Sequence, residues 1–267
     1  MRMRPDAIMC FLLLLLAAPP ACAQAKLERL YAIECGERTA PDVAPWTPGV
    51  NVGKPIDFVD NCYLLKHGDD WLVWDTGVAD ALFATPSTEP GAWKRKSTLK
   101  GDLEKIGVKP SDVKFVAVSH SHPDHVGNVE LFAQATLLVQ RAEYEWPNAN
   151  GTPRFVATHP VKLLDGDYDV FGDGSVRMVA TPGHTPGHQS LLVALPSTGA
   201  VLLSGDAVHL QDNWTARRVP AINADKDKTV ASMQKLADLI GQTRAQLWIN
   251  HDKPQSATIK RPPEFYQ

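Results

Sequence analysis

The most concentrated group of chemically active side chains in this sequence is the hexapeptide His120–His125, which reads His-Ser-His-Pro-Asp-His. In an extended chain His120 and His122 point to the same side, because side chains alternate with a period of two. The chain then bends, so Asp124 and His125 can face a second point nearby. Imidazole and carboxylate groups at this density favour zinc or a similar divalent ion. The hexapeptide therefore predicts a metal site, and its composition argues against the simpler interpretation of a polar surface loop.

Three further ligand-type residues follow other apolar segments. They are His184, Asp206 and His251, each the first strong metal ligand beyond a predicted strand. His184 lies in a turn rich in glycine and proline. Side chains that follow strand ends can converge on one rim of a sandwich of sheets. We therefore expect these three residues to join the hexapeptide in one site.

The segments that must position these residues are mostly short strands. Strands are predicted at 27–34, 58–66, 71–75, 113–118, 136–140, 168–171, 176–180, 190–195, 200–203 and 246–250. Three pairs joined by short turns are predicted to be hairpins: 58–66 with 71–75, 168–171 with 176–180, and 190–195 with 200–203. Many strands with a few interspersed helices predict an α/β protein in which helices cover two packed sheets.

Two helices are predicted with defined ends. Ser97 is expected to cap the first, which stops at Gly107. Apolar residues recur at helical spacing from 230 to 240 in the second, and Gly241 is expected to close it. Pro123 argues against a helix in the histidine loop, because proline disrupts the interior of a helix.

Composition limits the classes of protein to consider. The chain has 267 residues, of which 21% are charged and 44% hydrophobic, so it has ample apolar material for a folded core. No apolar run reaches the ~18 residues that a membrane-spanning helix needs. The net charge is −3 and the basic residues are scattered. This distribution argues against nucleic acid as a partner.

The first residues have the features of a secretory signal peptide. Two arginines stand near the start, an apolar run covers 8–18, and Ala-Cys-Ala follows at 21–23. We expect 1–23 to be removed, which leaves one domain over 24–267 and places the protein in the periplasm or outside the cell. A core helix and a lipid-bearing Cys22 are the alternatives.

Removal of that segment leaves two cysteines, Cys35 and Cys62. An exported compartment permits a disulfide between them, and a pair of buried thiols is the alternative. Two cysteines cannot form a zinc site made of four thiolates.

The full ligand pattern resembles that of the metallo-β-lactamase superfamily. His-x-His-x-Asp-His followed by His184, Asp206 and His251 matches the dinuclear ligand set of this family. The resemblance implies an αββα sandwich of two mixed sheets and two Zn²⁺ ions per chain, with other divalent metals as substitutes. By the family pattern the ligands of the first ion are His120, His122 and His184, and those of the second are Asp124, His125 and His251, with Asp206 bridging both.

Within the superfamily the sequence is most similar to the N-acyl homoserine lactone lactonases. The runs at 140–145, 164–168 and 181–191 look like theirs. The resemblance implies a zinc-dependent hydrolase that opens lactone rings and so quenches quorum signals. Two ions ~3.5–4 Å apart can share a hydroxide that attacks the carbonyl. In this reading Asp124 is also a catalytic residue, since it could pass a proton to the leaving group.

One position departs from the lactonase pattern. Familiar lactonases carry a tyrosine three residues after the bridging aspartate, where it can touch the substrate carbonyl, and this sequence has His209 there. An imidazole can still donate a hydrogen bond. His209 is therefore a second candidate catalytic residue.

Three other functions fit parts of the pattern. A β-lactamase of the third subclass shares the hexapeptide and the glycine-rich turn, but it normally lacks an aspartate at the position of Asp206. A glyoxalase-II-like thioesterase carries a helical extension after the last histidine, where this sequence has only a short stretch. A metal-free binding module would tend to lose ligands, and this chain has all seven. The expected partner is a small lactone or related carbonyl compound. No membrane contact is expected after signal cleavage. The sequence leaves open whether the protein forms a homodimer.

Other polar residues are interpreted from their positions in the sequence. Asp75 ends a predicted strand and either orients a metal ligand or belongs to an ordinary turn. His188 is interpreted as a packed or hydrogen-bonded side chain. His67 and His159 are expected in surface loops.

Overall fold

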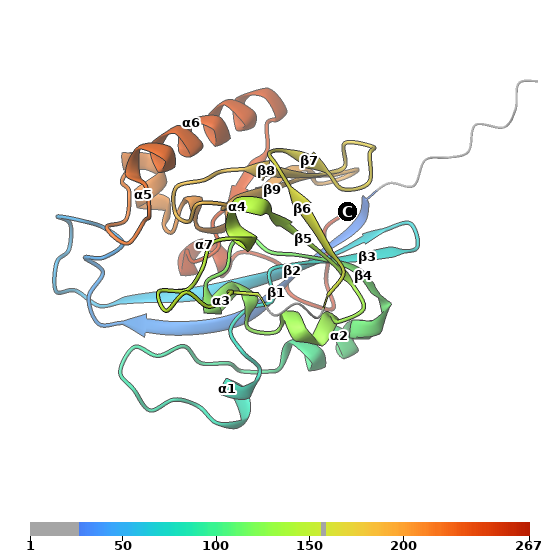
Figure 1. Cartoon of the computed structure of the whole chain (residues 1–267), viewed down its shortest axis with the longest axis horizontal. Coiled ribbons are helices and arrows are strands. Elements are labelled where there is room, and N and C mark those ends of the chain that lie inside the picture. The colour runs from blue at the N-terminus through green and yellow to red at the C-terminus, as the bar shows by residue number, and fades with distance from the viewer. Residues whose placement is uncertain (1–26, 156–158) are drawn as a thin grey trace, which may run out of the picture.

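The computed structural model describes residues 27–155 and 159–267, and its strands form two sheets (Figure 1). The first sheet has six strands in chain order: β1 (Leu27–Ala40), β2 (Ile56–His67), β3 (Asp70–Trp74), β4 (Val113–Ala117), β5 (Thr136–Gln140) and β6 (Val161–Leu164). Strands β1 to β3 are antiparallel, whereas β3 to β6 are parallel. This sheet is therefore mixed.

The second sheet has five strands in the order β11-β10-β9-β8-β7. They are β7 (Tyr168–Asp169), β8 (Val176–Ala180), β9 (Gln189–Leu195), β10 (Gly199–Leu203) and β11 (Gln246–Trp248). Only the β10–β11 pair is parallel among the described strands of this sheet. The three predicted hairpins are confirmed as β2–β3, β7–β8 and β9–β10.

Helices cover the outer face of each sheet. Leu99 and Leu103 of α2 (Leu99–Ile106) pack in one cluster with outward side chains of the first sheet. Leu236 of α6 (Lys226–Thr243) packs with Val179 and Leu202 of the second. The shorter helices are α1 (Ala81–Ala84), α3 (Pro123–Val126), α4 (Arg141–Tyr144), α5 (Gln211–Ala216) and α7 (Lys253–Ser256). The fold is thus an αββα sandwich, as predicted.

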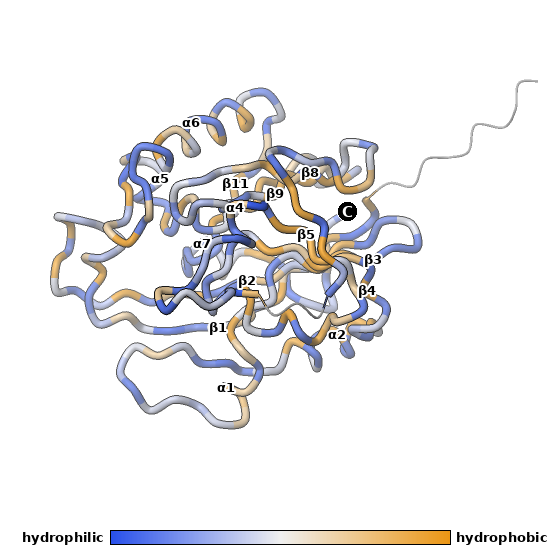
Figure 2. Tube along the Cα trace, viewed as in Figure 1, coloured by the Kyte–Doolittle hydropathy of each residue, from blue (hydrophilic) through white to orange (hydrophobic). Residues whose placement is uncertain are grey.

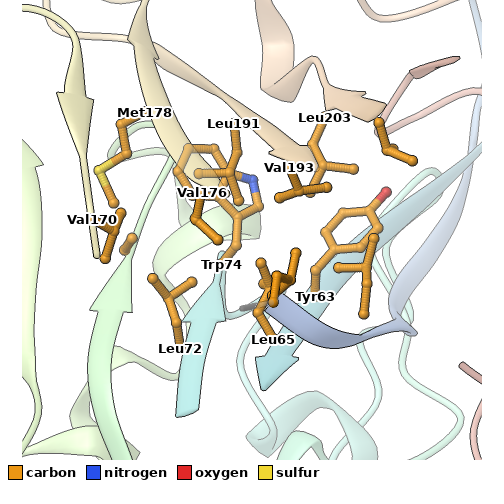
Figure 3. Close-up of a cluster of buried hydrophobic side chains, with 14 of the residues drawn as sticks. Tyr63, Leu65, Leu72, Trp74, Val170, Val176, Met178, Leu191, Val193 and Leu203 are labelled. Carbon is orange, nitrogen blue, oxygen red and sulfur yellow. The ribbon is translucent and has the colours of Figure 1, made fainter. Parts of the chain in front are cut away.

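The main core lies between the two sheets. Figure 3 shows side chains of β2 and β3, such as Leu65 and Trp74, facing Leu191 and Val193 of β9. In β2 both faces are buried, because Leu64 packs on the helix side while its neighbours face the other sheet. The strands at the centre are accordingly apolar along most of their length (Figure 2). Each fully buried large apolar side chain stabilises the fold by roughly 1.5–3 kcal/mol.

Two predicted helix ends were wrong by a few residues. The hydroxyl that caps α2 belongs to Thr98, which accepts from the backbone N–H of Gly101, rather than to Ser97. Gly107 does end that helix, in a left-handed conformation. Helix α6 continues past Gly241 and ends at Arg244, which adopts the left-handed conformation instead.

The histidine loop contains a short helix that the sequence analysis argued against. Helix α3 begins at Pro123 and is followed by Gly127. Proline is tolerated there because the first position of a helix needs no backbone N–H donor. Strand β6 was also missed, since it is only four residues long and only its last residue, Leu164, is buried.

A disulfide joins Cys35 of β1 to Cys62 of β2, with a Cα–Cα distance of 5.8 Å. This settles the choice left open between a disulfide and buried thiols. A side chain at Gly77 would meet the Cys35 Cβ at 2.3 Å, and Gly77 has a φ of +69°. The turn after β3 therefore packs closely against the disulfide. By restricting the unfolded chain over a separation of 27 residues, the disulfide contributes roughly 3.5 kcal/mol to stability.

Within 27–155 and 159–267, no helix combines the length and apolarity needed to cross a bilayer. The predicted signal peptide at 1–23 lies outside the described residues.

Candidate metal centre

The seven predicted ligands come together although they are spread over more than 130 residues. They lie in the segments that directly follow β4, β8, β10 and β11. Two groups of ligand atoms each lie within 4.8 Å of one another: His120, His122, His184 and Asp206 in one, and Asp124, His125 and His251 in the other. These are the two ligand groups that the sequence pattern predicts.

Three imidazole nitrogens of the first group face one point. The Nε2 of His120 is 2.9 Å from the Nδ1 of His122, and the Nε2 of His184 is 3.2 Å and 3.0 Å from those two atoms. A neutral imidazole has one N–H donor and one lone pair. Three such nitrogens cannot all be satisfied by one another, so the arrangement favours a shared cation.

Asp206 stands between the two groups. Its Oδ2 is 3.3 Å from the Nε2 of His184, while its Oδ1 is 3.3 Å from the Nε2 of His125 and 3.1 Å from that of His251. Asp206 lies just after β10, in a short 3₁₀ turn at Gly205–Ala207. The two oxygens of one carboxylate thus serve different histidine sets, which is the geometry of a bridging ligand.

The opposite nitrogen of four of these histidines is held by a fixed partner. The partners are Ser119 Oγ for His120 (3.0 Å), Asp75 Oδ2 for His125 (3.0 Å), Asn223 Oδ1 for His184 (2.9 Å) and the Val59 carbonyl for His251 (2.8 Å). A carbonyl or carboxylate oxygen only accepts, so the contacts of His125, His184 and His251 place a proton on Nδ1 and direct Nε2 toward a metal, whereas the Ser119 hydroxyl can donate to or accept from His120. Asp75 therefore orients a ligand rather than merely ending a strand.

Burial and neighbouring charges set the protonation of the ligands. Burial lowers the pKa of His120 and His184 well below its usual range, so both are neutral. Burial opposes ionisation of Asp206, but His251 and His209 hold its pKa well below the usual value. Burial likewise opposes protonation of His251, yet Asp206 raises its pKa to about 9. A metal binding at His251 would therefore displace a proton.

A pocket of about 190 Å³ opens over the ligands. Its other lining residues are Arg38, Trp46, Phe58, Trp93, Pro123, His209 and Ile222. The side chain of Asp124 is 18% exposed, whereas those of Asp206 and His251 are 4% exposed. Asp124 is thus a carboxylate ligand that a bound molecule could reach, and His122 is likewise only partly buried.

Comparison with known proteins identifies the family. Residues 56–240, more than half of the chain, match the metallo-β-lactamase superfamily. The chain belongs to the metallo-β-lactamase superfamily.

Several members of this superfamily are similar over nearly the whole chain. An N-acyl homoserine lactonase AttM of Azorhizobium caulinodans is 39% identical over 239 residues, which cover 82% of this chain and 89% of that protein. The N-acyl homoserine lactonase AiiA of Bacillus thuringiensis subsp. kurstaki is 27% identical, and the alignment covers 90% of this chain and 99% of that protein. Among solved structures, an N-acyl homoserine lactone hydrolase with N-hexanoyl-L-homoserine at its catalytic metal centre aligns with a TM-score of 0.79, at 26% identity over 90% and 99% of the two chains.

The metal that this superfamily implies fits the residues present. His125 Nε2 and Asp206 Oδ1 are buried and lie 3.3 Å apart, but neither makes a well-directed hydrogen bond within the described residues. Buried polar atoms of this kind are costly unless a ligand satisfies them. Both atoms point into the ligand cluster, where a divalent cation would satisfy them together with the three facing imidazole nitrogens.

His209, the predicted catalytic imidazole, lies inside the cluster. Its Nε2 is 3.1 Å from Asp206 Oδ2. Its ring centre is 5.0 Å from that of His184 and 5.6 Å from that of His251, onto which it stacks. It is 1% exposed. The packing fixes the orientation of the ring, so His209 offers a positioned imidazole in the lining of the pocket.

Glu143 is a site residue that the sequence analysis did not single out, although it stands in the lactonase-like run 140–145. Its fully buried carboxylate accepts hydrogen bonds from the N–H and hydroxyl of Ser121 (2.8 and 2.6 Å) and from the N–H of Gly187 (3.0 Å). It therefore ties the histidine loop to the loop that carries His184.

The remaining histidines are all buried. His188 accepts a hydrogen bond on Nε2 from the N–H of Asp206 (2.9 Å), and burial lowers its pKa to about 3. The prediction of a hydrogen-bonded His188 is confirmed. The expectation of surface positions for His67 and His159 was wrong, since each is 8% exposed.

Proposed function

We propose that this protein is an exported dinuclear zinc hydrolase that opens the ring of N-acyl homoserine lactones and thereby quenches quorum signals. The observation that carries the dinuclear reading is Asp206, whose two oxygens face separate histidine groups. The substrate class is supported by the relatives described as N-acyl homoserine lactonases, which share up to 39% of their residues with this chain.

Each of the two groups of ligand residues would bind one metal ion. One ion would be held by His120, His122 and His184, and the other by Asp124, His125 and His251. Asp206 would contribute to both, because its two oxygens face the two groups. Bound divalent ions would supply Lewis-acid polarisation of the ester carbonyl and activation of water at neutral pH.

The residues of the chain supply the remaining functions. Trp46, Phe58 and Trp93 line the pocket and exclude bulk water, which strengthens the electrostatic interactions inside it. The partly exposed carboxylate of Asp124 would take a proton from the attacking water and pass it to the alkoxide oxygen that leaves when the ring opens. His209 lines the pocket beside the ligands, and we assign its imidazole the role of donating a hydrogen bond to the oxygen of the reacting carbonyl. Such a fixed donor stabilises the negative charge that develops there.

The proposed substrate class predicts a preference for lactones over β-lactams. With zinc-loaded protein, we expect kcat/KM for N-hexanoyl-L-homoserine lactone to exceed that for benzylpenicillin. Asp206 is the physical reason, because it can hold two ions at fixed separation and β-lactamases of the third subclass normally lack it. Steady-state kinetics on both substrates decide the matter. A higher value for the penicillin would restore the β-lactamase alternative, and activity on thioesters alone would favour a thioesterase.

Export is the second part of the proposal. The charged start, the apolar run 8–18 and the Ala-Cys-Ala at 21–23 support it, and a disulfide between Cys35 and Cys62 suits an oxidising compartment. We expect protein isolated from its native host to begin at Gln24. Intact-mass spectrometry with N-terminal peptide mapping measures this. Retention of Met1, or a lipid on Cys22, would contradict the export route proposed.

A further inference from the structure

Arg38 is a cation in the pocket with no assigned role. It lies near the end of β1, opposite Phe58 of β2, and both side chains line the pocket. Its guanidinium carbon is 5.5 Å from the ring centre of Trp46 and 5.5 Å from that of Trp93. Ring faces attract cations, so the two indoles hold the guanidinium in place.

The bracketing rings also connect Arg38 to the ligand cluster. The ring centre of Trp93 is 5.7 Å from that of His251. The indole of Trp93 therefore lies between the guanidinium and a predicted metal ligand, and all three line the same pocket. A small molecule whose carbonyl sits at the ligands would extend toward Arg38.

The donors of Arg38 are not used within the described part of the chain. No hydrogen bond or ion pair is formed by its guanidinium there, and its Nε is buried. The neighbouring acids are engaged elsewhere: Glu37 is 2.9 Å from the Lys96 Nζ, and Asp57 is 3.2 Å from the Lys253 Nζ. Burial lowers the pKa of Arg38, and the charge of Asp124 works against that change. The guanidinium stays charged, because arginine does not deprotonate in proteins.

A structural arginine of the same chain has a different environment. Arg95 donates from Nε to the Ser97 carbonyl (2.7 Å) and from Nη1 to the Val78 carbonyl (2.8 Å), and it lies 3.4 Å from Asp80. A buried cation normally requires such partners. Arg38 has aromatic contacts but no such acceptors, and its side chain is only half-buried, so water solvates its exposed nitrogens until a ligand supplies an acceptor.

We propose that Arg38 is a specificity-determining residue that donates a hydrogen bond to the amide oxygen of the N-acyl chain. This inference rests on the proposed lactonase function. An N-acyl homoserine lactone has two oxygens in the reacting ester and a third on the amide, which is attached to the carbon beside the ring carbonyl. With the ester at the ligand cluster, the amide oxygen is the acceptor left for Arg38, and the acyl methylenes can pack on Trp46 and Trp93.

The test compares two lactones that differ in the amide alone. N-hexanoyl-L-homoserine lactone carries the acceptor, whereas α-heptyl-γ-butyrolactone has the same ring and a chain of the same length, with two methylenes in place of the amide. Arg38→Met keeps a flexible side chain between the indoles and removes the donors. A hydrogen bond to a charged donor corresponds to roughly a 10- to 100-fold change in binding. We expect Arg38→Met to lower kcat/KM by that factor on the amide lactone, mainly through KM, and to leave the alkyl lactone within about twofold.

Two further variants separate recognition from packing. Arg38→Lys keeps the charge but loses the planar fork, so we expect a partial loss on the amide lactone. Arg29→Met is the matched control, because the Arg29 guanidinium also sits over a ring, that of Phe265 at 4.8 Å, but outside the pocket. It should behave as wild type. An equal loss on both lactones in Arg38→Met, or no loss on either, would overturn the assignment.

Binding of the ring-opened product provides a readout that does not depend on turnover. We expect N-hexanoyl-L-homoserine to bind Arg38→Met 10- to 100-fold more weakly than wild type in calorimetry. If wild type opens neither lactone, the proposed function fails. Equal product affinity in the two proteins would show, separately, that Arg38 does not recognise the amide.

Discussion

Replacing Asp206 by alanine is expected to abolish nearly all activity and to weaken both metal sites. Its carboxylate is the shared element of the two ligand groups, since Oδ2 faces His184 and Oδ1 faces His125 and His251. The nearby histidines hold its pKa well below the usual range against the effect of burial, so it is ionised at any working pH. A bound metal contributes several kcal/mol to catalysis, and we expect kcat/KM to fall by about 10³-fold or more.

The measurement combines kinetics with metal analysis by atomic emission after zinc loading. Wild type should contain two ions per chain and Asp206→Ala fewer. Asp69→Ala is the matched control, because Asp69 is an exposed carboxylate in the turn between β2 and β3. Asp206→Ala that retains both ions and full rate would show that Asp206 does not bridge them. A single ion in wild type under zinc-replete conditions would contradict the dinuclear proposal itself.

Local sequence patterns predicted most of the strands and all three hairpins. The β2–β3 hairpin was predictable because two apolar runs flank a polar turn, and the structure pairs Tyr63 with Trp74 as such a hairpin requires. The errors at helix ends arose where a residue type is allowed at more than one position in a helix. Pro123 disrupts the interior of a helix but fits its first residue, which it occupies here. Gly241 can end a helix, but α6 continues to Thr243.

The seven metal-ligand residues were also predictable, because each is a histidine or aspartate that follows an apolar strand. The atoms that form hydrogen bonds to those ligands were harder to predict from the sequence. Asn223, which binds the Nδ1 of His184, lies 39 residues away, and the Val59 carbonyl that binds His251 has no sequence signature at all. His67 looked like a loop residue, but it stacks on Phe171 at 3.9 Å and lies 2.8 Å from Asp173. Such contacts between distant segments depend on the fold.

His209 is expected to act as a hydrogen-bond donor, which a pair of substitutions can test. His209→Phe keeps an aromatic ring of similar shape without a donor, and His209→Tyr adds back a single hydroxyl. The native ring is fixed by its packing on His184 and His251 and is 1% exposed. Loss of one fixed donor to a developing oxyanion costs about 10²-fold in rate. We therefore expect His209→Phe to lower kcat on N-hexanoyl-L-homoserine lactone by that factor and His209→Tyr to recover most of it.

Metal content separates this role from that of a ligand. The Nε2 of His209 is 3.1 Å from Asp206 Oδ2, close enough to the cluster to bind an ion directly. If His209 acts only as a donor, His209→Phe should retain the two ions of wild type and lose rate. Loss of an ion from His209→Phe would instead make His209 an eighth ligand. Equal rates in the phenylalanine and tyrosine variants would show that donation at this position does not matter. Because the two substitutions differ by one oxygen atom, packing alone should not produce a difference between them.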